Sequence, residues 1–168
     1  AESQTILGAL YESGQGVAMN LESAFEWYRK GAQQGHARAQ YHLGSMHLKG
    51  KGVPVNVSEA ARWFKLASDQ GDLSARCAYA ISLLESEGAP EKVHEGLRIL
   101  KTTEEGGCGE AQLNLGSVYM KGLGVPQSPE RAFKFFKQAA EGGNTEAQIA
   151  IGVLCETGKG VKQDIAEA

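Results

Sequence analysis

The motif Gly50-Lys51-Gly52, repeated as Gly158-Lys159-Gly160, is the stretch of this sequence closest to a phosphate-binding loop. A Walker loop has the pattern G-x-x-x-x-G-K-[ST], in which backbone N–H groups, the lysine and a hydroxyl surround the phosphates. Here five residues separate Gly44 from Gly50, and a glycine follows Lys51. Because the glycines also recur where no lysine accompanies them, we interpret the motif as turn geometry. No nucleotide or other cofactor is predicted.

Histidine and cysteine are the other residue types here that could bind a metal or attack a substrate. His42 and His47 lie five residues apart, off the i, i+4 spacing with which two helical histidines share a metal, so no metal site is predicted. Cys77, Cys108 and Cys155 lack CxxC spacing and are expected to be free thiols, with Cys155 buried and Cys77 exposed. No motif typical of a nucleophilic enzyme is found, so no catalytic residue is predicted, although distant residues can assemble a triad.

Composition narrows the classes of partner. The net charge of -3 and the pI near 5.8 do not supply the positive field that nucleic acid requires, so nucleic acid is not expected as a partner. No apolar run is long enough for a membrane span, and no direct membrane insertion is expected. The first residues lack an initiator Met and a signal-peptide pattern, from which we expect a piece of a longer protein. Cytoplasm, bacterial envelope and secretion all remain possible locations.

The positions of the glycines show an internal repeat. When the chain is written in rows of 36, the same residue types fall into columns without insertion or deletion. One column holds a Leu-Gly pair or its equivalent: Leu7-Gly8, Leu43-Gly44, Tyr79-Ala80, Leu115-Gly116 and Ile151-Gly152. This predicts a single solenoid with repeats at 1–36, 37–72, 73–108, 109–144 and an incomplete 145–168.

Each row reads as two helices. Ala39, Leu43 and His47 follow helical spacing, and an aromatic pair such as Trp63-Phe64 marks a second helix whose rings are expected to be buried. Good N-cap residues share one column, and glycines suited to left-handed helix ends follow both helices. The N-cap column is Asn20, Asn56, Ser128 and Asp164, with Glu59 and Glu167 expected to complete capping boxes. The fold class predicted is all-α, a right-handed α/α superhelical solenoid of helix-turn-helix repeats.

The repeat pattern resembles the Sel1-like repeat, a relative of the tetratricopeptide repeat. The pattern A-x-A-Q-x-x-L-G followed by G-x-G-V and an aromatic pair covers the whole chain, and residues 37–72 and 109–144 match it best. Residues 73–108 diverge, with Ser86 for the first-helix glycine, Lys92 in the N-cap column and Ile99-Leu100 for the aromatic pair. We leave open whether this repeat is degenerate packing or a partner-specific surface.

The resemblance implies a scaffold or adaptor that binds a partner protein or peptide without catalysis. One alternative is a hydrolase or β-lactam-binding protein of the cysteine-rich Sel1-like type, which carries paired cysteines that this chain lacks. Another alternative is a self-assembling structural solenoid that associates through its ends. In related tetratricopeptide arrays the first helices line a concave groove, and the matching positions here would bind the partner. They are Arg38, Tyr41, Ser45, Lys49, Cys77, Ile81, Glu85, Glu110, Leu113, Ser117, Lys121, Ile149, Val153 and Glu156. The other possibility is that neighbouring helices bury these side chains.

Overall fold

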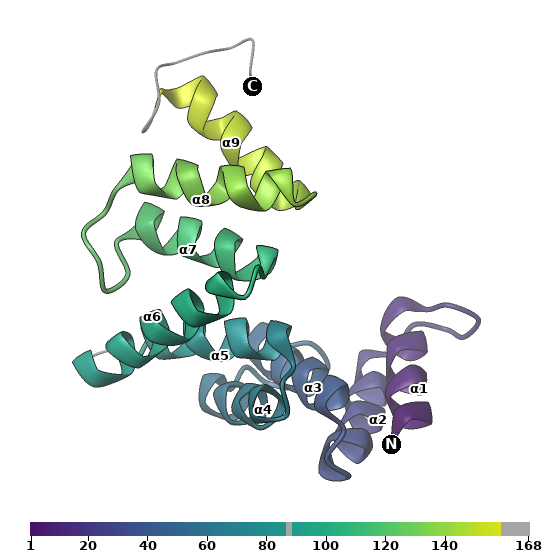
Figure 1. Cartoon of the computed structure of the whole chain (residues 1–168). Helices are drawn as coiled ribbons and strands as arrows, with labels where there is room; N and C mark the ends of the chain where they lie inside the picture. Colours follow the sequence, from purple (N-terminus) through teal and green to yellow (C-terminus); the bar gives the residue numbers. More distant parts are fainter. Residues whose placement is uncertain (87–88, 159–168) are drawn as a thin grey trace. The chain divides into compact units, whose positions relative to one another are not determined.

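The computed structural model describes residues 1–86 and 89–158, and in these ranges it contains α-helices and no strand. The fold is an all-α helical repeat solenoid (Figure 1). The helices are α1 (Glu2–Ser13), α2 (Leu21–Gln33), α3 (Ala37–Lys49), α4 (Val57–Asp69), α5 (Leu73–Leu84), α6 (Pro90–Glu105), α7 (Gly109–Lys121), α8 (Pro129–Glu141) and α9 (Thr145–Thr157). Odd-numbered helices are the first helix of each repeat, and even-numbered helices are the second.

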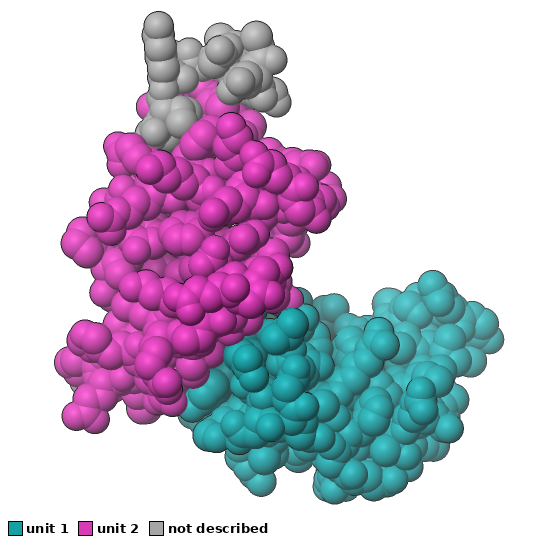
Figure 2. Space-filling model, viewed as in Figure 1, with its two compact units in different colours: residues 1–79 teal, residues 80–168 magenta. Residues whose placement is uncertain are grey.

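The chain forms two compact units, residues 1–79 and residues 80–168, which Figure 2 colours separately. In the first unit, α1 packs on α2, α2 on α3, and α3 on α4. In the second, α6 packs on α7, α7 on α8, and α8 on α9. Each unit therefore buries its apolar faces between helices that follow one another in sequence, as stacked helical repeats do.

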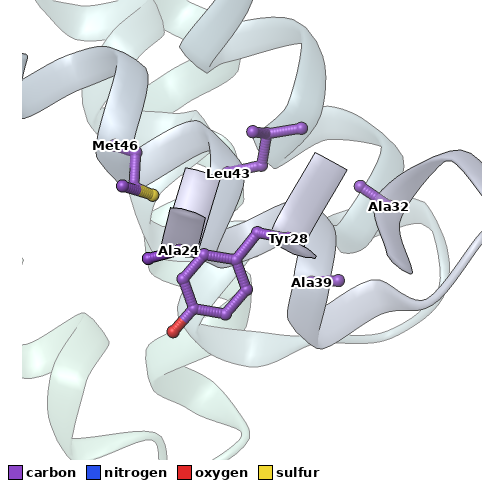
Figure 3. Packing of buried hydrophobic residues seen from close by; sticks show 6 residues of the cluster. All are labelled: Ala24, Tyr28, Ala32, Ala39, Leu43 and Met46. Carbon is purple, nitrogen blue, oxygen red and sulfur yellow. The ribbon is translucent and has the colours of Figure 1, made fainter. Parts of the chain in front are cut away.

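The core of the first unit lies between α2 and α3. It consists of Ala24, Tyr28, Ala32, Ala39, Leu43 and Met46, shown in Figure 3. The second unit has an equivalent core of Tyr119, Ala132, Phe136, Ala139, Ala147 and Leu154. The second ring of each aromatic pair is buried, as expected, at Tyr28, Phe64 and Phe136. The first ring of each pair is only partly buried.

The glycine of the Leu-Gly column makes room for that buried ring. A Cβ added to Gly8 would lie 2.6 Å from the Tyr28 ring, and one added to Gly116 would lie 2.5 Å from the Phe136 ring. Repeat three has the complementary change, because Ala80 stands in the glycine column and Leu100 in the ring column. Its own close approach is at Gly96, where a Cβ would lie 2.7 Å from the carbonyl oxygen of Ala80.

The helix ends follow the expected caps with two exceptions. Asn56 Oδ1 accepts the Glu59 N–H at 3.0 Å, and Gly50 ends α3 with a φ of 66°, a left-handed value that suits glycine. The capping box expected at Glu59 is wrong, because the Asn56 N–H donates to the His47 carbonyl and the Glu59 carboxylate pairs with Arg62. Asn20 and Ser128 cap their helices in the same way as Asn56. The expected caps Asp164 and Glu167 lie outside the described residues, as do Gly88, Lys159 and Gly160.

The second exception is α6. Lys92 stands in the N-cap column, but α6 begins at Pro90 with Ala89 as its N-cap, and Lys92 lies within its first turn. Pro90 explains the earlier start, since proline has a helical φ and its missing N–H is not needed at the first helical position. The divergent repeat is therefore a helix pair with a longer second helix of 16 residues.

Candidate functional site

A cavity of about 650 Å³ opens on the first unit between α1 and α3. Its apolar side is formed by α1, where Ile6 is 56% exposed and stands beside Ala9 and Leu10. Its polar side is formed by residues of α1, of the turn before α3 and of α3, with Tyr28 of α2 at its base. These polar residues are Glu2, Glu12, His36, Arg38 and His42. The cavity thus combines an apolar wall on α1 with basic and acidic groups.

Glu12 is held at this cavity by two donors from distant parts of the unit. The Tyr28 hydroxyl donates to Glu12 Oε2 at 3.0 Å, and Lys51 Nζ donates to Glu12 Oε1 at 3.1 Å. Burial by itself would raise the pKa of Glu12, but the hydrogen bonds from Lys51 and Tyr28 and the charge of Lys51 outweigh it and lower this pKa. Burial and the Glu12 charge raise the pKa of Tyr28. Glu12 is therefore ionised and has its charge compensated.

Lys51 reaches Glu12 because the loop after α3 is fixed at both ends. The Gly50 and Lys51 N–H groups both donate to the Met46 carbonyl, and the Asn56 N–H donates to the His47 carbonyl at 2.9 Å. The lysine that resembled part of a phosphate loop is thus paired with a carboxylate. This arrangement favours the interpretation of Gly50-Lys51-Gly52 as a turn over its interpretation as a phosphate-binding loop.

His42 lies flat against Tyr28 at the base of the cavity. The two rings are stacked with centroids 4.8 Å apart and planes 7° apart. Burial, together with Arg38, lowers the pKa of His42, although Glu12 and Asp72 act in the opposite direction. His42 is therefore neutral at pH 7, with one ring N–H able to donate and one ring nitrogen able to accept.

Arg38 and His36 complete the polar side. Arg38 is exposed at the start of α3, and no ion pair holds its guanidinium among the described residues. His36 precedes α3, and its Nδ1 shares a 2.9 Å hydrogen bond with the Thr5 hydroxyl. Arg38 is consequently the cation at this cavity whose charge no acidic side chain offsets.

The groove positions expected in the first unit divide into exposed and buried ones. Arg38 and Lys49 are exposed, Ser45 is half-buried, and Tyr41 is half-buried with its ring 5.8 Å from that of Phe64. The expectation that Cys77 is exposed is wrong, because its side chain has 0% exposure. Tyr41 and Cys77 turn toward helix–helix contacts, whereas His42, the residue after Tyr41, lines the cavity.

The expected positions in the second unit also differ in burial. Glu85, Lys121, Ile149, Val153 and Glu156 are exposed, whereas Ile81, Glu110, Leu113 and Ser117 are half-buried. Leu113 packs against the core of this unit, as the alternative of burial between helices predicted. Cys155 is buried as expected, and Cys77, Cys108 and Cys155 take part in no disulfide.

Sequence reasoning missed Glu12, Tyr28 and His42 as a group, although the repeat contains a signal for them. Leu48, Leu84, Met120 and Glu156 occupy the column of Glu12, and Phe64, Leu100 and Phe136 occupy that of Tyr28. The His42 column otherwise holds Ile6, Ala78, Asn114 and Ala150. Glu12 and Tyr28 thus differ from their counterparts in repeats two to four, His42 differs from all of its counterparts, and the three residues meet at one cavity. Comparing the columns for polar exceptions would have identified them.

Stacked helix pairs with a ligand-sized cavity on the first-helix side define a helical-repeat solenoid, a class that commonly binds other proteins. The family model of the Sel1 repeat matches residues 1–36, 37–72, 109–144 and 145–168, and the chain belongs to this family. Sel1 repeats generally mediate protein–protein interaction, and the scaffold is generally non-catalytic. The matched ranges leave out residues 73–108, the divergent repeat.

Two solved structures are similar to this chain. A Sel1 repeat protein from Oxalobacter formigenes aligns with a TM-score of 0.73 and 32% identity over 99% of this chain and 66% of that one. A protective antigen present in uropathogenic Escherichia coli strains, displaying an SLR fold, aligns with a TM-score of 0.70 and 29% identity over 99% of this chain and 36% of that one. This chain thus spans less than two thirds of each. No curated protein matches it.

Neither a metal-binding cluster nor a membrane-spanning helix occurs in the described ranges. Residues 1–86 and 89–158 contain no group of three or more His, Cys, Asp or Glu side chains placed to hold a metal ion. Within the same ranges, every helix is too short or too polar to cross a bilayer.

Proposed function

We propose that this chain is a non-catalytic protein-binding module that holds a segment of a partner protein or peptide on its first helices. The observation that carries the proposal is the cavity between α1 and α3, with Ile6 exposed on one side and Arg38 and His42 on the other. Exposed apolar side chains beside unpaired polar groups are typical of sites that anchor a partner side chain.

The remaining first-helix positions extend this surface within each unit. Ser45 and Lys49 follow Arg38 along α3, and Lys121 and Glu156 are exposed near the ends of α7 and α9. Tyr41, Cys77 and Leu113 contribute to packing, so a partner would contact their neighbours. The binding surface we propose is therefore the first-helix face without those three side chains.

Selection of displayed random peptides on the immobilised chain tests this proposal. We expect peptides to be enriched by the wild type and lost with Ile6→Asp, which places a charge on the apolar wall. Leu66→Asp is the matched control, since Leu66 is an exposed apolar residue of α4 outside the cavity. Failure to enrich any peptide, or equal binding to Ile6→Asp, would contradict the proposed site.

A second candidate, self-association, is favoured by one observation on α9. Ile149 and Val153 are 65% and 52% exposed, whereas Leu113, in the Ile149 column, packs against the core of its unit. Another helix pair could cover Ile149 in the same way. Sedimentation equilibrium of the wild type and Ile149→Asp measures this: a concentration-dependent increase in mass that the variant abolishes supports it, and a monomer at all concentrations excludes it.

A further inference from the structure

We propose that the cavity between α1 and α3 recognises a carboxylate of the partner, with Arg38 and His42 as the donors and Ile6 as the contact for a neighbouring aliphatic side chain. This inference rests on the proposed function and names the chemistry of the partner segment. The carboxylate is either an Asp or Glu side chain or the carboxyl terminus of the partner.

The first step of the argument is the balance of charge. Two acidic residues border the cavity. Glu12 is already neutralised by Lys51 and accepts the Tyr28 hydroxyl as well, so it has little remaining capacity for a cationic ligand. Glu2 is exposed in the first turn of α1, where the helix N-terminus stabilises a negative charge. Arg38 has no acidic partner in the described ranges. A guanidinium presents a planar fork of N–H donors that matches a carboxylate. Arg38 is therefore the cation of the cavity that is available to pair with a carboxylate of a ligand.

The second step is the direction of hydrogen bonding at His42. The imidazole is held flat on Tyr28, and no hydrogen bond to another described group occupies its ring nitrogens. A neutral imidazole can donate one N–H to an acceptor in the cavity. The carboxylate would then accept from both Arg38 and His42, one turn apart on the cavity side of α3.

The third step explains why Glu12, Tyr28 and Lys51 accompany these donors. The Glu12–Lys51 ion pair links α1 to the loop after α3, and the Glu12–Tyr28 hydrogen bond fixes the ring on which His42 stacks. These three are positioning residues, because they orient His42 without facing the ligand as donors. Repeats two to four carry apolar residues in the Glu12 column, namely Leu48, Leu84 and Met120, and therefore lack the carboxylate on which this network depends.

The fourth step is the apolar wall. Ile6 is more than half exposed, although α1 is otherwise packed on α2 and α3, and it lies beside Ala9 and Leu10 on the same cavity. An aliphatic side chain next to the carboxylate would cover Ile6 and remove apolar surface from water. The recognised unit is consequently an aliphatic residue adjacent to a carboxylate, which a cavity of about 650 Å³ can accommodate.

Two peptide libraries test this inference on the whole chain. One displays random heptapeptides with a free carboxyl terminus, and the other displays them internally, with both ends fused. Enrichment of a terminal aliphatic residue in the first library alone identifies the chain terminus as the source. Enrichment of Asp or Glu beside Leu, Ile or Val in both identifies a side chain.

The affinity of an enriched peptide is then measured by fluorescence polarisation. We expect Arg38→Ala and His42→Ala to weaken binding at least about tenfold, and Arg98→Ala, an exposed arginine of α6, to leave it unchanged. His42→Asn, which keeps an N–H donor, should recover part of the loss. Amidation of the terminus, or replacement of Glu by Gln in the peptide, should reproduce the loss.

The outcomes separate this inference from the proposed function. Peptides that depend on Ile6 but lack an acidic group or a terminal preference would overturn the carboxylate assignment and leave the binding function intact. Peptides that bind Arg38→Ala as tightly as the wild type would also overturn the carboxylate assignment and leave the binding function intact. Failure of both libraries to enrich any peptide would overturn both proposals.

Discussion

The ring of Phe64 lies against Gly44 so closely that a Cβ on the glycine would be 2.7 Å from Cε1 of the ring. Gly8 and Tyr28 have the same relationship, as do Gly116 and Phe136. The packing of each repeat therefore depends on two positions twenty residues apart, a glycine and the ring that it accommodates. In repeat three both positions change together, since Ala80 replaces the glycine and Leu100, which has no ring, replaces the aromatic residue.

Gly44→Ala should destabilise the chain. Overpacking typically costs about 1–3 kcal/mol, which exceeds the gain of about 1 kcal/mol from replacing a helical glycine by alanine. In the background of Phe64→Leu, the same change should be neutral or stabilising, because that pair then matches Ala80 and Leu100. Urea unfolding of the four proteins gives a coupling free energy that we expect to exceed about 1 kcal/mol.

Gly109→Ala is the control for this cycle. A Cβ on Gly109 has no neighbour within 4 Å, so this variant should be as stable as the wild type or more stable. Equal destabilisation by Gly44→Ala with either residue at position 64 would show that the ring does not cause the effect.

Glu12 and Tyr28 should be coupled in stability. Glu12→Leu leaves the buried Tyr28 hydroxyl without its acceptor, which costs about 1–3 kcal/mol. Glu12→Leu combined with Tyr28→Phe restores the residue types of repeat two, Leu48 and Phe64, and should be at least as stable as the wild type. Thermal unfolding measures the three variants; a double variant less stable than Glu12→Leu would show that the pair serves stability and not the site.

Stability should fall with acidification partly through His42. Its pKa is lowered in the folded state, so its contribution is present above the ordinary histidine pKa of about 6.5 and is lost as the pH falls through that value toward the folded pKa. Glu12 on α1, Tyr28 on α2, Arg38 on α3 and Asp72 before α5 surround this ring.

The measurement is the melting temperature of the wild type and of His42→Gln between pH 7.5 and pH 5.5. We expect a smaller decrease for the variant, whatever its stability at pH 7.5. Identical slopes would show that His42 is charged equally in the folded and unfolded states. Glu12 contributes at lower pH, since its lowered pKa stabilises the fold above about pH 4.5.

The three thiols should differ in reactivity. Cys77 and Cys155 are buried, and Cys108 is intermediate in burial at the start of α7. With a thiol reagent such as DTNB, we expect one equivalent to react at least about tenfold faster than the other two, and three to react after unfolding. Cys108→Ser should remove the fast phase. Fewer than three thiols in the unfolded chain would favour the paired cysteines of the alternative hydrolase class.

The cap of α4 should matter more than the side chain at the corresponding position of α6. Asn56→Ala removes the acceptor of the Glu59 N–H and should cost about 1 kcal/mol, by chemical denaturation. Lys92→Ala, in the same column, should change stability by less than about 0.5 kcal/mol because Lys92 is exposed in the first turn of α6. A larger loss from Lys92→Ala would contradict the earlier start of α6.

The sequence by itself determined the period, the helix pairs and most of their ends. These features depend on local chemistry: Asn56 caps its own helix, Gly50 takes a left-handed φ, and the Gly44 column and the Phe64 column repeat together. The helix α6 starts earlier than the repeat predicts because Pro90 provides a competing local signal two residues before the expected cap position, Lys92.

Only the tertiary structure decided which first-helix column faces the cavity. Adjacent residues on a helix point about 100° apart, so the rotation of α3 about its axis decides whether Tyr41 or His42 faces the cavity. Packing against α2 and α4 sets that rotation. The burial of Cys77 follows from the same kind of contact. Glu12 and Lys51 are 39 residues apart and meet because the loop after α3 returns to α1, a proximity that no local pattern encodes.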